Sequence, residues 1–168
     1  MTSAVPSTIS VNQLAELSHM AAGLPRGRKN LNLHAELDAP VQRLFNAMEP
    51  CTYVRPHRHA RPNGWELMLW ISGAFAVILF DESGLITERL VLDGRGSLIA
   101  VEIPSQIWHS VVSLESGTVM FEVKEGPYSP VEDKDFAPWG PFENTPEAAL
   151  FLRWLASATP GSSPPASW

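Results

Sequence analysis

The feature that most constrains the fold of this chain is a series of short apolar segments between about residues 41 and 124. The segments are rich in Val, Ile, Leu and aromatic residues, and Gly, Asp, Asn and Pro separate them. Short apolar runs punctuated by turn residues are typical of an antiparallel all-β unit, closed as a barrel or packed as a sandwich. The strands that we expect are 51–56, 65–71, 74–80, 86–92, 98–103, 107–114 and 118–124. The segment 41–48 fits neither the helical nor the strand period cleanly.

Each end of the β region carries a predicted helix. Ser10 and Gln13 form an S-x-x-Q capping box ahead of apolar residues at helical spacing, so a short helix follows them. Thr145, a proline and Glu147 predict the start of a second helix, because they supply an N-cap, a first helical residue and an acid in the first turn. We expect an N-terminal arm and short helix over 1–25, the barrel over 26–143, the C-terminal helix over 144–156 and a disordered tail over 157–168.

Length, charge and cysteine content narrow the class of protein. The 168 residues are about the size of one domain, and the 45% hydrophobic content is sufficient for a core. A net charge of −6 provides no positive field for a phosphate backbone or an anionic membrane, so we expect neither nucleic acid nor membrane as a partner. Cys51 is the only cysteine, which excludes an internal disulfide and favours a cytoplasmic location.

The residues that point to chemistry are three histidines and one glutamate. His57 and His59 are two residues apart, so in an extended strand both imidazoles point to the same face. Glu66 begins the next expected strand, where a hairpin partner would place its carboxylate beside them, and His109 comes from a later strand. Imidazole with carboxylate suits a divalent transition metal such as Fe, Mn, Ni, Co or Zn, and the absence of thiolates disfavours a structural zinc site. We therefore expect one such ion on these four residues, whereas an isolated His-x-His pair would fit two surface histidines equally well.

This spacing resembles the first motif of the cupin superfamily, G-x5-H-x-H-x3,4-E-x6-G. The corresponding residues here are Cys51, His57, His59, Glu66 and Gly73, with a gap of six residues before the glutamate that includes Pro62, Asn63 and Gly64. The second cupin motif is matched by Pro104 and His109, with Gln106 in place of a glycine and Ser113 in place of an asparagine. The resemblance implies an all-β, RmlC-like antiparallel β-barrel or jelly roll with short N-terminal and C-terminal helices. It also implies a homodimer.

Further stretches are similar to the WbuC family of cupin-fold metalloproteins. They are 28–34, 41–44, 53–59 and 121–128, which extend the resemblance from about residue 26 to residue 139. That family implies a metal-bound barrel, sometimes associated with bacterial surface polysaccharides, and no settled reaction.

Four other residues are weaker candidates for a catalytic role. Arg55 shares a strand face with His57 and could hold an anionic group, although pairing with a carboxylate at the barrel mouth explains it equally well. Tyr53 fits a core position as well as a pocket. Glu122 and Lys124 share one face of a strand and could serve as acid and base, but a solvated ion pair is the simpler interpretation.

Two functions compete on this sequence. The first is a metalloenzyme of the isomerase, lyase, hydrolase or oxygenase type that acts on a small molecule, with carbohydrates favoured by analogy. The alternative is a non-catalytic module that binds a small ligand through its metal. A metal-free epimerase fits less well, because it would need one histidine with a carboxylate and not three converging histidines. We favour the enzyme.

Overall fold

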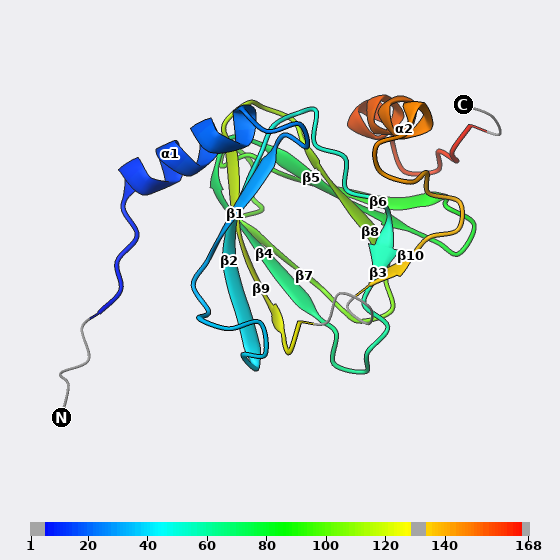
Figure 1. Cartoon of the computed structure of the whole chain (residues 1–168). Coiled ribbons are helices and arrows are strands. Elements are labelled where there is room, and N and C mark those ends of the chain that lie inside the picture. The colour runs from blue at the N-terminus through cyan, green and yellow to red at the C-terminus, as the bar shows by residue number, and fades with distance from the viewer. Residues whose placement is uncertain (1–5, 129–133, 166–168) are drawn as a thin grey trace.

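The computed structural model describes residues 6–128 and 134–165. Within those ranges the chain forms two antiparallel five-stranded sheets that face each other, with one helix outside each sheet (Figure 1). The elements are α1 (Val11–Ala22), β1 (Arg28–Asn32), β2 (Val41–Met48), β3 (His57–Arg58), β4 (Glu66–Ser72), β5 (Phe75–Phe80), β6 (Ile86–Leu92), β7 (Ala100–Ile103), β8 (Trp108–Ser113), β9 (Thr118–Glu125), β10 (Asp135–Phe136) and α2 (Pro146–Ser157). The predicted all-β class is confirmed.

The strand order separates neighbours in the sequence into different sheets. Sheet A has the order β1-β2-β9-β4-β7, and sheet B has the order β10-β3-β8-β5-β6. β4 and β5 follow each other in the chain but lie in different sheets, so the turn between them carries the chain from sheet A to sheet B. Gly73 makes this turn with a φ of +68°, and a Cβ there would lie 2.6 Å from the Thr118 hydroxyl oxygen. Only glycine fits that turn without strain.

The main core fills the space between the two sheets. Alternate residues of each strand point inward, and they bury apolar side chains such as Met68 and Met120 from sheet A against Phe75, Val77 and Val111 from sheet B. Because the inner faces are apolar over much of their length, the polar residues that do point inward are the unusual ones, and they gather at one end of this space.

α1 covers part of the outer face of sheet A. Its predicted capping box is present, since the Ser10 hydroxyl accepts a hydrogen bond from the Gln13 backbone amide at 3.2 Å and the Ser10 amide donates to the Gln13 side chain at 2.8 Å. Leu17 and Ala21, one helical turn apart, are buried against Ala47 and Val119. The helix is therefore held by one apolar stripe.

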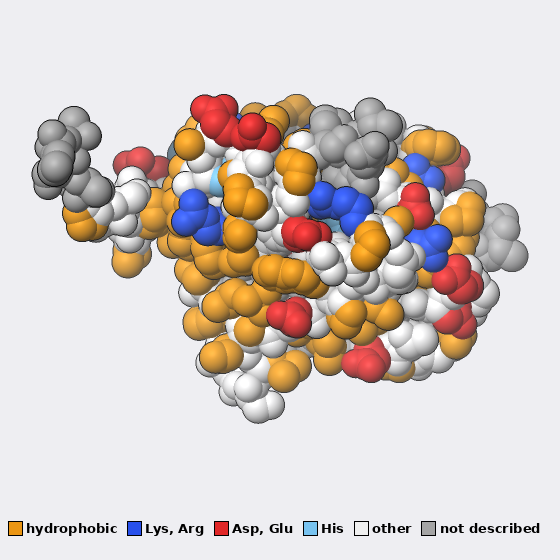
Figure 2. Space-filling view, turned by 90° about the horizontal axis from the view of Figure 1, so that it is seen from below, with side chains coloured by type: hydrophobic (Ala, Val, Ile, Leu, Met, Phe, Trp, Pro, Cys, Tyr) orange, Lys and Arg blue, Asp and Glu red, His pale blue; other side chains and the backbone are white. Residues whose placement is uncertain are grey.

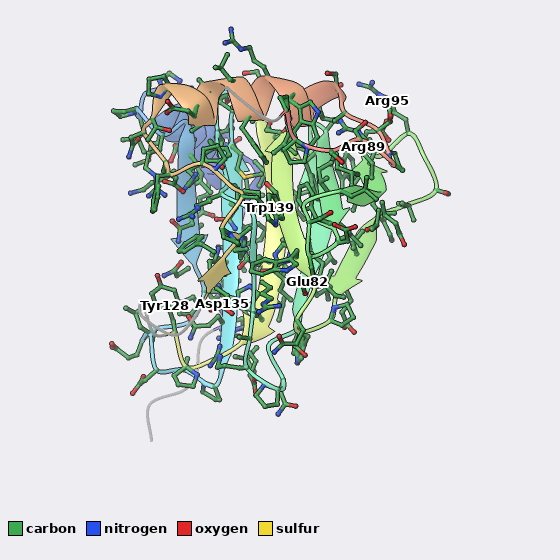
Figure 3. All side chains as sticks on the ribbon, turned by 90° about the vertical axis from the view of Figure 1, so that its right-hand side faces the viewer. Glu82, Arg89, Arg95, Tyr128, Asp135 and Trp139 are labelled. Carbon is green, nitrogen blue, oxygen red and sulfur yellow. The ribbon has the colours of Figure 1, made fainter. Side chains whose placement is uncertain are left out.

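α2 lies across the outer face of sheet B. The Thr145 hydroxyl caps it by accepting from the Ala148 amide at 3.2 Å, and Phe151 and Leu155 are fully buried against the sheet. Arg89 from β6 donates to the carbonyl oxygens of Leu155 at 2.7 Å and Ala156 at 2.9 Å. Figure 3 shows Arg89 near one end of this helix. A cation at these carbonyls stabilises the C-terminal end of the helix.

Several segments differ from the sequence expectations, and β1 and β10 were not among the expected strands. The segment 41–48, which was ambiguous, forms strand β2. The segment 51–56, expected as a strand, forms none. The carbonyls of Tyr53 and Val54 accept hydrogen bonds from side chains instead of a neighbouring strand, from Arg28 and from Ser110 at 2.7 Å. Residues 158–165, expected within a disordered tail, bond to β6, since the amides of Ile86 and Gly161 donate to the carbonyls of Ser162 and Ile86 at 2.9 and 2.8 Å. Residues 166–168 lie outside the described ranges.

Apolar side chains are not confined to the interior. On the outer face of sheet A the rings of Phe45 and Phe121 lie 4.7 Å apart, and Leu67 and Leu69 are half-buried. Figure 2 shows a broad hydrophobic area on the face of the molecule that is seen from below. No helix in the described parts of the chain is long and apolar enough to cross a membrane.

Candidate metal centre

The four residues expected to hold a metal come from both sheets. His57 in β3 and His109 in β8 are direct partners across the strands of sheet B. Glu66 is the first residue of β4 in sheet A, where it pairs with Ile103 and Lys124. The expectation that Glu66 reaches the histidines as a hairpin partner is therefore wrong, because the glutamate approaches them from the opposite sheet across the interior.

His59 is positioned by a loop that follows β3. The loop closes with a turn in which the Gly64 amide donates to the Arg61 carbonyl at 3.0 Å, and a Cβ at Gly64 would lie only 2.7 Å from the Cβ of His59. The longer gap before Glu66 is thus absorbed by a tight turn that packs directly against a histidine. The amide of Gln106 donates to the His59 carbonyl at 3.0 Å and fixes the loop from its other side.

Gln106 stands where the second cupin motif has a glycine. Its φ is +69°, in the left-handed region that favours glycine, and its side-chain amide donates to the carbonyl of Ala60. The turn shape associated with the glycine is therefore retained by a glutamine whose hydrogen bonds hold it in place. His109 follows three residues later in the expected position.

The four side chains converge on one point. One ligand-type atom from each of His57, His59, Glu66 and His109 lies within 4.8 Å of the others, and all four residues are buried. Nε2 of His109 is 2.6 Å from one carboxylate oxygen of Glu66, and Nε2 of His59 is 3.4 Å from the other. The 2.6 Å contact lacks hydrogen-bond geometry, because Nε2 of His109 and Oε1 of Glu66 are both without a hydrogen-bond partner. This is the arrangement of atoms that face a shared third partner.

The outer nitrogens of two imidazoles are fixed by the backbone. Nδ1 of His57 lies 2.9 Å from the Arg55 carbonyl, and Nδ1 of His109 lies 2.9 Å from the Ile107 carbonyl. A carbonyl only accepts, so each Nδ1 carries the proton in the neutral ring and each Nε2 presents a lone pair to the centre. Metal-ligating histidines are typically oriented in this way.

The protonation states also favour a cation. Burial, together with the charge of Lys134, lowers the pKa of His57 well below its usual value of 6.5, so this imidazole is neutral at pH 7. Burial alone would raise the pKa of Glu66, but its interactions with His109 and His59 outweigh that effect and hold the pKa well below the usual range. At pH 7 the centre therefore presents the ionised carboxylate of Glu66 and the neutral imidazole of His57.

A divalent metal fits these residues. A fully buried carboxylate needs a compensating charge, and the nitrogens of His57 and His109 that point at the centre are buried without a hydrogen-bond partner. Oxygen and nitrogen donors without sulfur match borderline first-row ions. His57, His59, Glu66 and His109 could thus hold one such ion.

A cavity of about 390 Å³ adjoins the centre between the two sheets. Its wall includes His57 and Glu66, apolar residues such as Met68 and Met120, and a large number of charged side chains. Small-molecule sites typically have volumes of roughly 300–1,000 Å³. The space beside the centre is of the size for a small ligand.

Two of the weaker candidates have structural roles. Tyr53 does not line the cavity, since its ring packs in the core under α2, its hydroxyl donates to the Pro141 carbonyl at 2.9 Å, and burial raises its pKa. Arg55 does line the cavity, but its guanidinium donates to the carbonyls of Gly140 at 3.0 Å and Ala137 at 3.1 Å. Arg55 is held by the backbone and not by a carboxylate.

Glu122 and Lys124 lie inside the molecule and not on its surface. Both are 8% exposed and line the cavity, with 3.5 Å between the Lys124 nitrogen and a Glu122 oxygen. The interpretation as a solvated pair is therefore wrong. The other Glu122 oxygen accepts from the Asn46 side chain at 2.6 Å, which places Asn46 on the same wall. The sequence reasoning missed Asn46, although alternation through Leu44, Asn46 and Met48 would have given the inward face of β2.

Solved structures similar to this one are cupins. Over 83% of this chain and 89% of the other, a protein from Shewanella oneidensis superposes with a TM-score of 0.52 and 13% identity. Oxalate oxidase in complex with the substrate analogue glycolate gives 0.52 with 17% identity over 81% of this chain and 74% of that chain. Recombinant oxalate oxidase in complex with glycolate superposes with a TM-score of 0.50 and 17% identity, over 70% of this chain and 58% of that chain. These likenesses confirm the cupin fold that the motifs predicted.

Comparisons at the level of sequence give the family. No curated protein matches the chain. One family model, described as "Domain of unknown function (DUF6016)", matches residues 9–92, which is half of the chain and includes three of the four residues of the centre. The chain, which has a cupin fold, therefore belongs to the DUF6016 family.

Proposed function

We propose that this chain is a small-molecule metalloenzyme that holds one divalent transition metal on His57, His59, Glu66 and His109. The single observation that carries the proposal is the convergence of four buried donor groups, from two sheets, on one point at the wall of a cavity. The ion would be Fe, Mn, Ni, Co or Zn, and when bound it would supply Lewis acidity or redox chemistry to a ligand beside it.

The chain's own residues would orient the ligand and move protons. The cavity brings Glu122 and Lys124 next to the centre, where a buried carboxylate and a buried ammonium 3.5 Å apart could accept and donate a proton. The hydrogen bond from Asn46 holds the Glu122 carboxylate in place. Met68 and Met120 form an apolar part of the same wall.

The reaction class that we propose is isomerase, lyase or oxygenase. The resemblance to the WbuC family supports a substrate related to carbohydrates, and this part of the proposal rests on the resemblance alone. We also propose a homodimer, on the same basis, which light scattering coupled to size-exclusion chromatography tests directly.

The decisive experiment is elemental analysis of protein purified without a metal-affinity column. We expect close to one equivalent of a first-row transition metal per chain, and none after Glu66 and His109 are replaced together by Gln and Ala. Metal-loaded protein would then be assayed for turnover against small hydroxylated substrates, with Glu122→Gln as the variant that keeps the metal. Absence of stoichiometric metal would contradict the proposal, and binding without turnover would favour the non-catalytic module.

A further inference from the structure

The three lysines of this chain, Lys29, Lys124 and Lys134, all line the cavity beside the metal centre. They come from β1, from β9 and from the segment just before β10, so three separate parts of the fold bring them to one space. The chain has more acidic than basic residues, 18 against 12. Cationic groups are therefore scarce, and their concentration at one cavity distinguishes it from the rest of the surface.

The charges on the cavity wall give an excess of positive charge. Six lysine or arginine residues line it, but only three carboxylates do, which reverses the balance of the whole chain. Glu143 is paired with Arg26 at 2.8 Å and Arg28 at 2.7 Å, and Glu66 belongs to the metal centre. Clefts lined by one sign of charge attract molecules of the other sign.

The sheet places Lys124 beside the centre. It is the direct partner of Glu66 across β9 and β4, and both side chains point into the interior. Residues directly opposite each other have Cβ atoms roughly 5 Å apart. An acidic group bound at Lys124 would therefore lie within a small molecule's length of the metal.

The wall next to Lys124 is polar in a different way. Asn46 and Glu122 are joined by a hydrogen bond of 2.6 Å, and together they present amide and carboxylate groups that recognise hydroxyls. At about 390 Å³, the cavity lies near the lower end of the range of roughly 300–1,000 Å³ that small-molecule sites span. This size suits a single small ring or chain.

We propose that the cavity binds a small hydroxylated organic anion, with its carboxylate or phosphate at Lys124 and its hydroxyls toward Asn46 and Glu122. Lys29 and Lys134 add the surrounding positive charge that selects an anion over a neutral molecule of the same shape. The inference deepens the proposed function and rests on it, because the anion occupies the space beside the proposed metal.

The test compares three sugars that share one ring and differ in a single substituent, which is neutral in one and acidic in the other two. Glucose, glucuronate and glucose 6-phosphate would be titrated by calorimetry into protein loaded with one equivalent of Mn(II), for the natural chain and for Lys124→Met. Arg95→Gln is the matched control, since it also removes one positive charge, but from a side chain that is 74% exposed and lies away from the cavity. Figure 3 shows Arg95 at the opposite end of the molecule from Tyr128, which lines the cavity.

We expect at least one of the two anions to bind about tenfold or more tightly than glucose, and Lys124→Met to remove that preference, because a hydrogen bond to a charged group is lost. The anion that binds more tightly identifies the acidic group. Arg95→Gln should bind as the natural chain does. Lys124→Met leaves Glu122 without its cation. The double variant Glu122→Gln/Lys124→Met is therefore measured in parallel, and it should also lose the preference for anions over glucose.

Equal affinity for glucose and both anions would overturn the inference, as would an anion preference that survives in both Lys124 variants. The metal content of each variant separates this result from failure of the proposed function. If Lys124→Met retains a full equivalent of Mn(II), the metal centre stands whatever the ligand titration gives. Loss of metal from the natural chain itself would instead contradict the proposed function.

Discussion

His57 and His109 are direct partners across β3 and β8, and the centroids of their rings lie 4.3 Å apart. Each ring has its outer nitrogen held by a backbone carbonyl two residues earlier in the chain, just before its strand begins, at 2.9 Å in both cases. The two strands thus present the two inner nitrogens in the same way. Either histidine alone is insufficient for the proposed centre, because the ion needs donors from both strands.

Replacement of either histidine by alanine is expected to abolish stoichiometric metal binding. His57→Ala and His109→Ala each remove a fully oriented donor from a buried centre, whereas His19 is exposed on α1. Elemental analysis should find less than about a tenth of an equivalent in the two variants and an unchanged equivalent in His19→Ala. Full occupancy of His109→Ala would contradict the four-residue centre.

Glu66→Gln should weaken metal binding by about ten- to a hundredfold without abolishing it. An amide oxygen carries less charge than a carboxylate, and the remaining imidazoles still converge. Competition with a fluorescent chelator measures the change in Kd. Glu102→Gln is the matched control, because Glu102 lies in neighbouring strand β7 with its side chain exposed. If Glu66→Gln binds as tightly as the natural chain, the carboxylate role passes to Glu122.

Gly64→Ala should raise the Kd for the metal by about tenfold. A Cβ at this position would lie 2.7 Å from the His59 Cβ and 3.1 Å from the Arg61 carbonyl, so the loop that positions His59 must shift. In the control Gly96→Ala, the new Cβ would meet only a side-chain oxygen at 3.6 Å, and metal affinity should be unchanged. Equal affinities in both variants would show that the position of His59 tolerates the shift.

Removal of the metal should lower the melting temperature without unfolding the chain. The barrel buries an apolar core of its own between the sheets, so the metal is not required for folding. At free metal about a hundredfold above the Kd, the stabilisation is roughly 2.7 kcal/mol, which corresponds to a shift of about 5–11 °C for a chain of this size. Melting curves followed by circular dichroism, with and without chelator, measure both quantities. A wholly unfolded metal-free protein would assign the ion a structural role.

The stability of the metal-free protein should fall as the pH decreases below about 6.5. In the folded chain the pKa of His57 is well below that value, so the unfolded chain binds a proton that the folded chain excludes. The contribution is therefore present above pH 6.5 and is lost progressively below it, by up to about 1.4 kcal/mol at pH 5.5. Urea unfolding at pH 7.5 and 5.5 measures the loss, which should be smaller in His57→Gln. An equal loss in that variant would assign the effect to other groups.

Much of the fold follows from local patterns in the sequence. The predicted strand 86–92 coincides with β6, and the capping box at Ser10 places the start of α1 correctly. These elements have one apolar face or a side chain that bonds to its own neighbours, so no information from elsewhere in the chain is needed. The segment 41–48 was ambiguous because Ala47 and Met48 are both buried, one beneath α1 and the other between the sheets, which breaks the alternation.

The candidate centre was predicted in composition but not in its three-dimensional arrangement. The spacing of His57, His59, Glu66 and His109 was enough to name the four residues that the structure brings together. Their division between two sheets depends on the turn at Gly73 and on the pairing of β4 with β7 and β9, which are long-range features. The burial of Glu122 and Lys124 was missed for a similar reason, since only the opposite sheet shows which face of β9 is inside.

The placement of the lysines would direct amine-specific reagents to one cavity. Apart from the amino group at the chain terminus, an acylating label or a coupling matrix finds primary amines only at Lys29, Lys124 and Lys134, all on the wall of one cavity. Immobilisation through lysine would therefore tether the chain by its proposed site and obstruct it. Conversely, the rate at which a small reagent acylates the chain reports on the occupancy of that cavity. A bound ligand would shield the amines and lower the rate, whereas an empty cavity would leave them accessible.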